Sequence, residues 1–316
     1  MLKVCIVGAP PNAEIYYNIL KEFADVVAVV ENEYEYARKF LETYQIPVYP
    51  TPRDVLREKN YDAAVVLVPP SMRYRVLQEI LSEGRHVLVE PPVTDNIETA
   101  LRICNLADYQ GVLLAVAYPK RFNPAIVKAR ELIEGGETGM PISLQSTIYT
   151  LERYPDIFDA FAPEELDVLR FISGVDIAKI SVVSAQGGRV YSASIKFIND
   201  LTATMHLASQ TSCAIEELLI NCEAQSLLVD YRNQDLFRLS MLQSDADREL
   251  GLQPELKKYR VDIVKEDPMK LIVRNFVEAL TKGVKPLTTG YESVRVMESY
   301  LAARHSANTE ALVRLR

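Results

Sequence analysis

Two carboxylates of this chain directly follow short apolar runs, a position from which they could contact a ligand. Glu31 follows the apolar run 26–30, and Glu90 follows the apolar run 87–89. If both runs are strands of one parallel sheet, the carboxylates border the crevice at the carboxyl ends of the strands, where such sheets bind ligands. A carboxylate after the second strand accepts ribose hydroxyls and disfavours a 2′-phosphate. Glu31 therefore predicts NAD rather than NADP, unless it is only a solvated carboxylate on a polar loop.

The turn after the first apolar run matches a dinucleotide-binding fingerprint in part. That fingerprint, G-x-G-x-x-G/A, brings backbone N–H groups and a helix N-terminus to the pyrophosphate. The turn reads Gly-Ala-Pro-Pro-Asn-Ala, in which Gly8 and Ala13 fit but Pro10 replaces the middle glycine. Pro10 adds bulk and, like Pro11, has no N–H. The turn predicts a strand followed by a helix, with Gly8, Asn12 and Ala13 as cofactor-binding candidates, although the prolines weaken the expectation of tight dinucleotide binding.

These residues lie within a regular alternation of apolar runs and amphipathic segments. The runs read as strands, and the segments between them have the spacing of helices. The predicted strands are 2–7, 26–30, 48–49, 63–68, 87–89 and 112–118. Pro91 and Pro92 stop the fifth strand because proline cannot continue its hydrogen bonding. Thr94 or Asp95 is expected to cap the next helix. This alternation predicts an α/β fold with a doubly wound parallel sheet over residues 1–119.

The rest of the chain, residues 120–316, is expected to form a second domain. Its long segments alternate in character, which predicts a largely antiparallel open sheet with one face packed. The predicted strands are 142–150, 180–185, 190–197, 203–209, 215–222 and 226–231. A helix is expected over 164–172, with Glu164 after Pro163 in its first turn. Residues 244–254 are expected to form a loop, and residues 292–314 a closing helix.

The composition argues against two classes of partner. Lys and Arg number 35 against 43 Asp and Glu, a formal net charge of −8, whereas nucleic acids and anionic membranes call for a basic face. No apolar run approaches the roughly 18 residues of a membrane span, so the cytoplasm is the expected location. The four cysteines lie in apolar patterns without C-x-x-C spacing, which predicts buried, reduced thiols. Together with dispersed histidines, this spacing predicts no metal site.

Several motifs, in order and spacing, resemble the Gfo/Idh/MocA family of NAD(P)-dependent oxidoreductases. Glu90-Pro91-Pro92 stands where that family has Glu-Lys-Pro, and residues 118–124, Tyr-Pro-Lys-Arg-Phe-Asn-Pro, resemble its Arg-Phe-x-Pro segment. Pro69 begins a segment similar to the family's nicotinamide-side loop. The resemblance covers nearly the whole chain. It implies a Rossmann domain followed by an α/β domain, a small-molecule substrate, and a homodimer or higher homo-oligomer formed through the open sheet of the second domain.

The resemblance also shows what has changed in the proton-handling positions. The family's dehydrogenases typically use the Lys of Glu-Lys-Pro together with an Asp and a His in an Asp-x-Gly-x-His segment. In this chain these positions are Pro91, Ala160 and Glu164. A one-residue shift would bring Asp159 to the Asp position but would still leave the His missing.

Other ionisable groups could replace these residues. Glu164 could act as a base if burial raised its pKa, and Lys120 and Tyr118 are the other catalytic candidates. Arg121 could pair with an anionic substrate. The alternatives are that Glu164 only complements a helix dipole and that Arg121 is structural.

Two hypotheses of function remain, from different classes. The first is an NAD-dependent oxidoreductase of a sugar, polyol or related small hydroxy compound, with altered catalytic positions. The second is a non-catalytic ligand-sensing or partner protein that keeps the fold but has lost the dehydrogenase chemistry. The changed glycine, Lys, Asp and His positions favour the second, and the resemblance favours the first.

Overall fold

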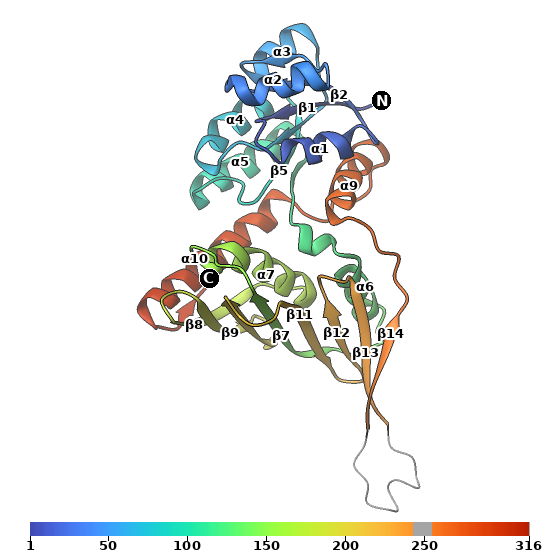
Figure 1. Ribbon diagram of the computed structural model, residues 1–316, viewed down its shortest axis with the longest axis vertical. Helices are drawn as coiled ribbons and strands as arrows, with labels where there is room; N and C mark the ends of the chain where they lie inside the picture. The colour runs from blue at the N-terminus through green and yellow to red at the C-terminus, as the bar shows by residue number, and fades with distance from the viewer. Residues whose placement is uncertain (243–254, 316) are drawn as a thin grey trace, which may run out of the picture. The chain divides into compact units, whose positions relative to one another are not determined.

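A computed structural model describes residues 1–242 and 255–315, and the chain divides into two compact units (Figure 1). The first unit comprises Met1–Pro119 and Asp267–Met297, and the second comprises Lys120–Glu266 and Glu298–Arg316. This division differs from the continuous second domain predicted, because residues 267–297 belong to the first unit. Helix α9 (Pro268–Lys282) packs beside the first helix of the chain. Lys270 on α9 also forms an ion pair with Glu22 at 2.5 Å.

The first unit contains a six-stranded sheet in the order β3-β2-β1-β4-β5-β6. Every neighbouring pair in it is parallel, which confirms the predicted doubly wound sheet. The strands are β1 (Lys3–Val7), β2 (Asp25–Val30), β3 (Val48–Tyr49), β4 (Ala63–Val66), β5 (His86–Val89) and β6 (Leu114–Val116). The helices between them are α1 (Ala13–Leu20), α2 (Tyr34–Thr43), α3 (Pro52–Glu58), α4 (Pro70–Ser82) and α5 (Ile97–Gln110). The central strands are buried throughout because helices cover both faces of such a sheet.

Helix α5 begins at Ile97, one residue later than a cap at Asp95 would place it and two later than a cap at Thr94. Its N-cap is Asn96, whose side-chain oxygen accepts hydrogen bonds from the N–H groups of Glu98 and Thr99. The prediction of Thr94 or Asp95 as the cap is therefore wrong. Thr94 is buried, and its hydroxyl donates to the Asn96 carbonyl at 2.8 Å, so it braces the cap.

The second unit contains a nine-stranded mixed sheet in the order β14-β13-β12-β11-β7-β10-β9-β8-β15 among the described residues. Only the β7–β10 pair is parallel; the other neighbouring pairs in this order are antiparallel. The largely antiparallel sheet is thus confirmed. The strands are β7 (Pro141–Thr150), β8 (Ile177–Ala185), β9 (Val190–Phe197), β10 (Thr202–Ser209), β11 (Ile215–Cys222), β12 (Ser226–Asp230), β13 (Asp235–Leu242), β14 (Glu255–Val261) and β15 (Val313–Arg314). Strands β13 and β14 were not predicted.

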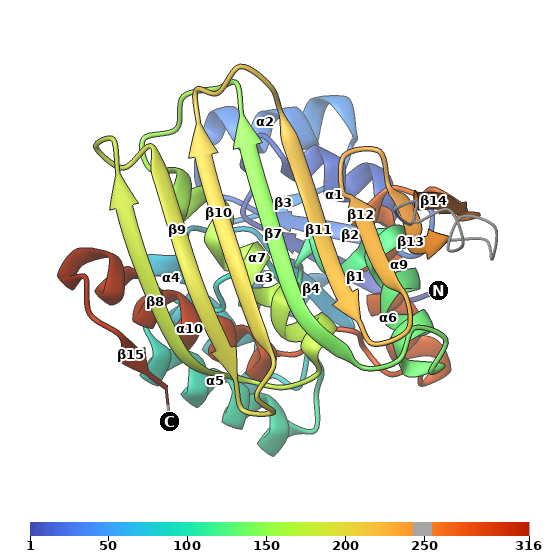
Figure 2. The same cartoon turned by 90° about the horizontal axis from the view of Figure 1, so that it is seen from below.

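One face of this sheet is covered and the other is not. Helix α7 (Ile157–Ser173) packs on β7, β9 and β10, and α6 (Pro124–Glu134) packs on β12 and β13. Figure 2 shows the strands β8 to β11 face-on; the face towards the viewer is uncovered, and the helices lie behind the sheet. Along β9 and β10 that face presents exposed Ser and Thr side chains, those of Ser192, Ser194, Thr202 and Thr204.

Helix α7 is longer than predicted. It begins at Ile157, capped by the Asp156 side chain, and contains Pro163 in its interior. Glu164 therefore does not lie in a first helical turn, so the prediction that it complements the helix dipole there is wrong.

The last predicted helix is shorter than expected, and one predicted loop lies outside the described residues. Helix α10 (Gly290–Thr309) ends before residue 314, and Val313–Arg314 instead pairs with β8. The predicted loop 244–254 falls in the part of the chain that the structure does not describe.

The four cysteines are free thiols. Cys5, Cys104 and Cys222 are buried, as predicted, but Cys213 is exposed. The prediction is wrong at Cys213 because this residue lies in the turn between β10 and β11, not within a strand.

Gly8, at the end of β1, is required by both backbone and packing. Its φ is +90°, and a Cβ there would lie 3.0 Å from the Val68 backbone N and 3.0 Å from Val68 Cγ1. Gly84 has a φ of +70° but nothing within 4 Å of a Cβ. We expect Gly84→Ala to lower the free energy of unfolding by about 1–2 kcal/mol from backbone strain alone.

Gly84→Ala serves as the control. Gly8→Ala should lower the free energy of unfolding by roughly 1–3 kcal/mol more than this control does, because the added methyl group overpacks the contact with Val68. Urea denaturation of both variants, followed by circular dichroism, measures the difference. Equal losses would show that β1 and β4 separate easily at this point.

Candidate functional site

A cavity of about 1080 Å³ lies in the first unit, at the carboxyl ends of its parallel strands. Five of the six predicted cofactor-binding residues line it: Gly8, Asn12, Glu31, Pro69 and Glu90. They come from the ends of β1, β2, β4 and β5, which the parallel topology brings to one edge. The sixth, Ala13, is not among the lining residues and is fully buried at the start of α1.

Backbone N–H groups hold the carboxylate of Glu31 at the wall of this cavity. One oxygen accepts from Ala9 at 2.7 Å, and the other accepts from Asn32 at 2.7 Å and from Glu33 at 2.9 Å. Glu31 is partly exposed. Because each carboxylate oxygen has two lone pairs, Glu31 retains acceptor capacity for a ligand hydroxyl.

The turn after β1 uses most of its own N–H groups internally. Gly8 donates to the Val30 carbonyl, and Ala13 donates to the Pro10 carbonyl, both at 2.8 Å. Ala9 donates to Glu31, and neither Pro10 nor Pro11 has an N–H. The residues therefore fit the nucleoside end of a dinucleotide, with its ribose hydroxyls on a carboxylate, but do not supply the usual N–H cradle for a pyrophosphate.

Arg73, which the sequence reasoning missed, fixes the strand ends that form the cavity. It is 3% exposed, and its Nε donates to the Val68 carbonyl at 2.8 Å. Its Nη1 donates to the Glu90 carbonyl at 2.5 Å and also to the Pro92 carbonyl. Burial lowers the pKa of Arg73, against the opposing effect of the nearby Glu90 carboxylate. The helical spacing of Arg73 to Leu77, on the buried face of α4, was the signal that could have identified it.

The carboxylate of Glu90 joins β5 to α1. Its Oε1 accepts from Asn12 Nδ2 at 2.9 Å and from the Tyr16 hydroxyl at 3.2 Å. Burial raises the pKa of the Tyr16 phenol, and the charge of Glu90 raises it further, so Tyr16 remains a donor. Asn12 is thus occupied by Glu90 and makes no side-chain cap for α1.

The second unit contains a lysine enclosed by carboxylates. Lys120 Nζ lies 2.6 Å from Glu165 Oε1 and 3.5 Å from Glu216 Oε2, with the Tyr231 ring 5.0 Å away. Burial by itself lowers the pKa of Lys120, but Glu165 and Glu164 outweigh it, so the net pKa is raised. Lys120 is therefore a fixed ammonium group. Sequence reasoning identified Lys120 but missed Glu165 and its partners.

Glu165 is fully buried, whereas its neighbour Glu164 is half-buried. Glu165 Oε2 accepts hydrogen bonds from the hydroxyls of Ser146 and Tyr231. Burial raises the pKa of Glu164, and the Lys120 ammonium lowers it only in part. Glu164, the less buried of the two carboxyl groups, therefore takes up a proton more readily than an ordinary glutamate.

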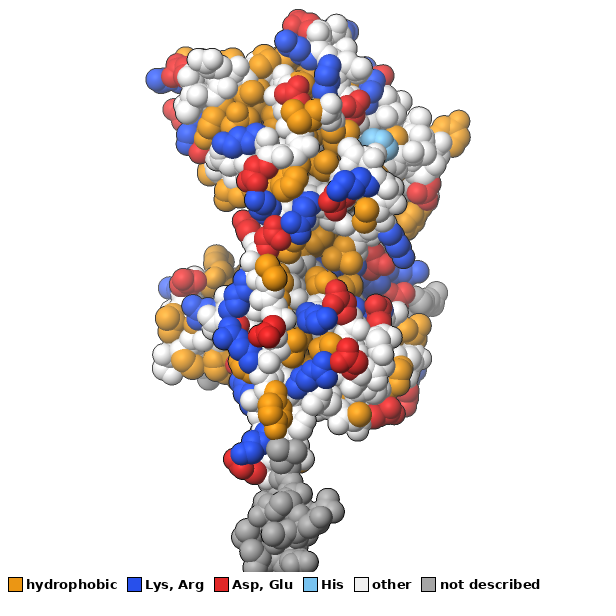
Figure 3. Space-filling view, turned by 90° about the vertical axis from the view of Figure 1, so that its right-hand side faces the viewer, with side chains coloured by type: hydrophobic (Ala, Val, Ile, Leu, Met, Phe, Trp, Pro, Cys, Tyr) orange, Lys and Arg blue, Asp and Glu red, His pale blue; other side chains and the backbone are white. Residues whose placement is uncertain are grey.

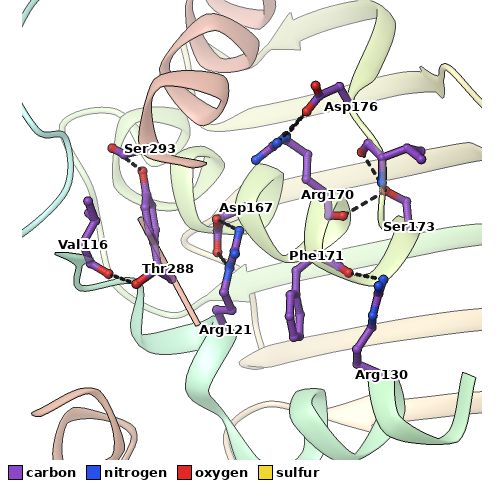
Figure 4. Close-up of polar contacts among 12 residues, drawn as sticks. Val116, Arg121, Arg130, Asp167, Arg170, Phe171, Ser173, Asp176, Thr288 and Ser293 are labelled. Atoms are coloured by element: carbon purple, nitrogen blue, oxygen red, sulfur yellow. Dashed lines mark hydrogen bonds and ion pairs between the residues drawn. The ribbon is translucent and has the colours of Figure 1, made fainter. Parts of the chain in front are cut away.

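Two other predicted site residues are buried and have partners within the protein. Tyr118 is 1% exposed, and its hydroxyl lies 3.1 Å from the Ser293 Oγ. Arg121 is 3% exposed and forms a bidentate pair with fully buried Asp167, with Nε at 2.9 Å from Oδ2 (Figure 4). The guanidinium fork of Arg121 is thus directed at a carboxylate of the protein, which favours the structural alternative over a substrate contact.

The described residues carry neither a metal cluster nor a membrane-spanning element. Residues 1–242 and 255–315 contain no group of three His, Cys, Asp or Glu side chains arranged to hold a metal ion. Every helix in these ranges is too short or too polar to cross a lipid bilayer. Figure 3 shows acidic and basic side chains interspersed on the drawn face of each unit.

The raised pKa of Glu164 predicts a pH dependence of stability. An acid whose pKa is higher in the folded state stabilises the fold below its unfolded pKa, here near 4.5, and that stabilisation is lost as the pH rises through the folded pKa. Gln does not titrate, so the Glu164→Gln variant does not lose this stabilisation. The free energy of unfolding of the variant should therefore rise relative to that of the wild type as the pH increases from 5 to 8.

Urea denaturation at several pH values provides the measurement. Glu131→Gln, at an exposed position on α6, is the control and should follow the wild-type pH profile. A Glu164→Gln profile parallel to the wild type would contradict the assignment.

Comparison with known proteins identifies sequence relatives of the first part of the chain. The model of the oxidoreductase family with an NAD-binding Rossmann fold, GFO_IDH_MocA, matches residues 2–118. Inositol 2-dehydrogenase 2 of Mycolicibacterium vanbaalenii is 27% identical over 139 residues, 42% of this chain and 40% of the relative. The scyllo-inositol 2-dehydrogenase (NAD(+)) of Bacillus subtilis is 25% identical over 138 residues, 41% of this chain and 40% of the relative. The matches thus span about two fifths of the length of these relatives.

Solved structures share the fold over the whole chain. UDP-N-acetylglucosamine 3-dehydrogenase GnnA of Acidithiobacillus ferrooxidans has a TM-score of 0.85 at 18% identity, covering 98% of both chains. Scyllo-inositol dehydrogenase of Lactobacillus casei, solved with NAD(H) and scyllo-inositol, has a TM-score of 0.81 at 14% identity, covering 99% of both chains. At these identities the likeness shows the fold alone. The Rossmann-domain model of the Gfo/Idh/MocA oxidoreductase family thus matches residues 2–118, and the chain as a whole shares the fold of the solved structures.

Proposed function

We propose that the chain binds NAD in the cavity of its first unit and is an NAD-dependent oxidoreductase of a sugar, polyol or related small hydroxy compound. The family match of residues 2–118 supports a nicotinamide cofactor. The similarity to inositol 2-dehydrogenases supports a polyhydroxy substrate.

The observation that carries the proposal is the oriented carboxylate of Glu31 beside the cavity. Three backbone N–H groups fix it, so it offers a preformed acceptor to a ribose hydroxyl of an adenosine. A 2′-phosphate at the same place would meet the charges of Glu31 and Glu33, both of which line the cavity. This arrangement favours NAD over NADP.

The reaction needs a group that accepts the hydroxyl proton of the substrate. Bound NAD would accept the hydride, and in this chain Pro91 cannot take the proton. We assign that role to Glu164, because a carboxyl group with a raised pKa is suited to proton transfer near neutral pH. Lys120, held as an ammonium by Glu165, would act as a hydrogen-bond donor to a substrate oxygen rather than as a base.

A second candidate function is a ligand-sensing or partner protein without dehydrogenase chemistry. Two observations favour it: Pro91 replaces the family's lysine, and the turn after β1 lacks the N–H cradle. Binding of NAD without turnover of any hydroxy compound would support this candidate.

We also propose a homodimer or higher homo-oligomer formed through the sheet of the second unit. The uncovered face of β9 and β10 supports this proposal, and light scattering of the purified protein tests it. The expected compartment is the cytoplasm, which cell fractionation tests.

Calorimetric titration with NAD, NADH, NADP and NADPH tests cofactor binding and the role of Glu31. We expect the non-phosphorylated forms to bind at least about tenfold more tightly, a difference of about 1.4 kcal/mol. Glu31→Ser should reduce this preference because it removes the charge that repels a 2′-phosphate. Glu35→Ser, at an exposed position outside the cavity lining, serves as the control for a general loss of negative charge. Absence of binding by all four nucleotides would refute the proposed function.

Substitution of Glu164 tests the proton acceptor. Once a substrate is identified from a panel of polyols and sugars, Glu164→Gln should lower turnover by at least about 100-fold, the scale of general base catalysis. Its affinity for NAD should remain unchanged, and Glu131→Gln should keep full activity. NADH formation followed by absorbance measures turnover, and retained turnover in Glu164→Gln would exclude this residue as the base.

A further inference from the structure

We propose that the cavity holds NAD chiefly through its adenosine half, and that the diphosphate contributes little affinity. An unphosphorylated nucleoside should therefore compete with NAD on nearly equal terms. This inference rests on the proposed function, because it concerns the same cavity and the same cofactor.

The first argument is the number of N–H donors available to a diphosphate. Binding at a helix N-terminus normally relies on several free backbone N–H groups. In the turn before α1, two residues are prolines, and the N–H groups of Gly8, Ala9 and Ala13 donate to protein oxygens. The Asn12 side chain donates to Glu90. A diphosphate placed here would gain few of the charge-assisted hydrogen bonds that usually hold it.

The second argument is the charge of the cavity. Four glutamates line it, and only two arginines. The glutamates are Glu31, Glu33, Glu79 and Glu90. Arg73 is buried, and its Nε and Nη1 donate to the carbonyls of the strand ends. These donors are therefore already used within the protein and not offered to a diphosphate. Arg75 is the exposed arginine of this lining. The net charge of the wall is negative, which opposes an anionic diphosphate.

The third argument is what the same wall offers to a nucleoside. Glu31 provides an oriented acceptor for a ribose hydroxyl. Tyr36 and Met72 also line the cavity and are 45% and 55% exposed. Their apolar surfaces suit the flat face of a base, which gains affinity by stacking on an aromatic ring. The neutral and polyhydroxylated half of NAD therefore matches the wall better than its charged centre does.

The test compares adenosine, ADP-ribose and NAD by calorimetry on the full-length protein. We expect the three dissociation constants to lie within about tenfold of one another, or about 1.4 kcal/mol. Tight NAD binding with adenosine more than about tenfold weaker would overturn the inference and leave the proposed function standing. Failure of NAD itself to bind would overturn the proposed function, and the inference with it.

Pro10→Gly provides a gain-of-affinity test that does not depend on activity. Restoring an N–H and removing the proline ring should tighten NAD and ADP-ribose by about tenfold, the scale of one charge-assisted hydrogen bond. Adenosine affinity should not change. Pro50→Gly is the matched control, since Pro50 lines the same cavity away from the turn. Equal effects of Pro10→Gly on adenosine and NAD, or no effect on NAD, would show that the turn does not limit diphosphate binding.

Discussion

The cavity of the first unit depends on one buried cation. Strand β5 is followed by Pro91 and Pro92, which have no N–H with which to fix this end of the sheet. Arg73 resolves this by donating from one guanidinium to the carbonyls of Val68, Glu90 and Pro92. The same interaction holds Glu90 where Asn12 and Tyr16 can reach its carboxylate. The ends of β4 and β5 and the start of α1 are thereby fixed together, and the cavity wall with them.

The second unit uses buried ion pairs in a comparable way. Asp167 and Glu165 are fully buried, and each meets a cation of the segment that begins the unit, Arg121 and Lys120 respectively. Removing one partner of a buried pair is strongly destabilising because the other charge is left without compensation. These pairs hold Arg121 and Lys120 on buried carboxylates of the second unit, with the half-buried Glu164 next to Glu165.

The sequence predicts features that depend on local pattern. Continuous apolar runs identify the parallel strands, and the carboxylates that follow them mark the cavity wall at Glu31 and Glu90. Features that depend on tertiary contacts were missed. Arg73 looks like an ordinary helix residue until it is seen on the buried face of α4. Strand β14, Glu-Leu-Lys-Lys-Tyr-Arg-Val, carries too many charges to show a two-residue apolar period, and only its pairing with β13 makes it a strand.

The most direct test of this account is a crystal structure of the protein with NAD bound. The account predicts an adenosine in the cavity of the first unit, with a ribose hydroxyl within hydrogen-bonding distance of the Glu31 carboxylate. Arg73 should keep its contacts with the carbonyls of Val68 and Glu90. NAD bound elsewhere, or bound in the cavity with its ribose away from Glu31, would contradict the central claim that this carboxylate recognises the cofactor.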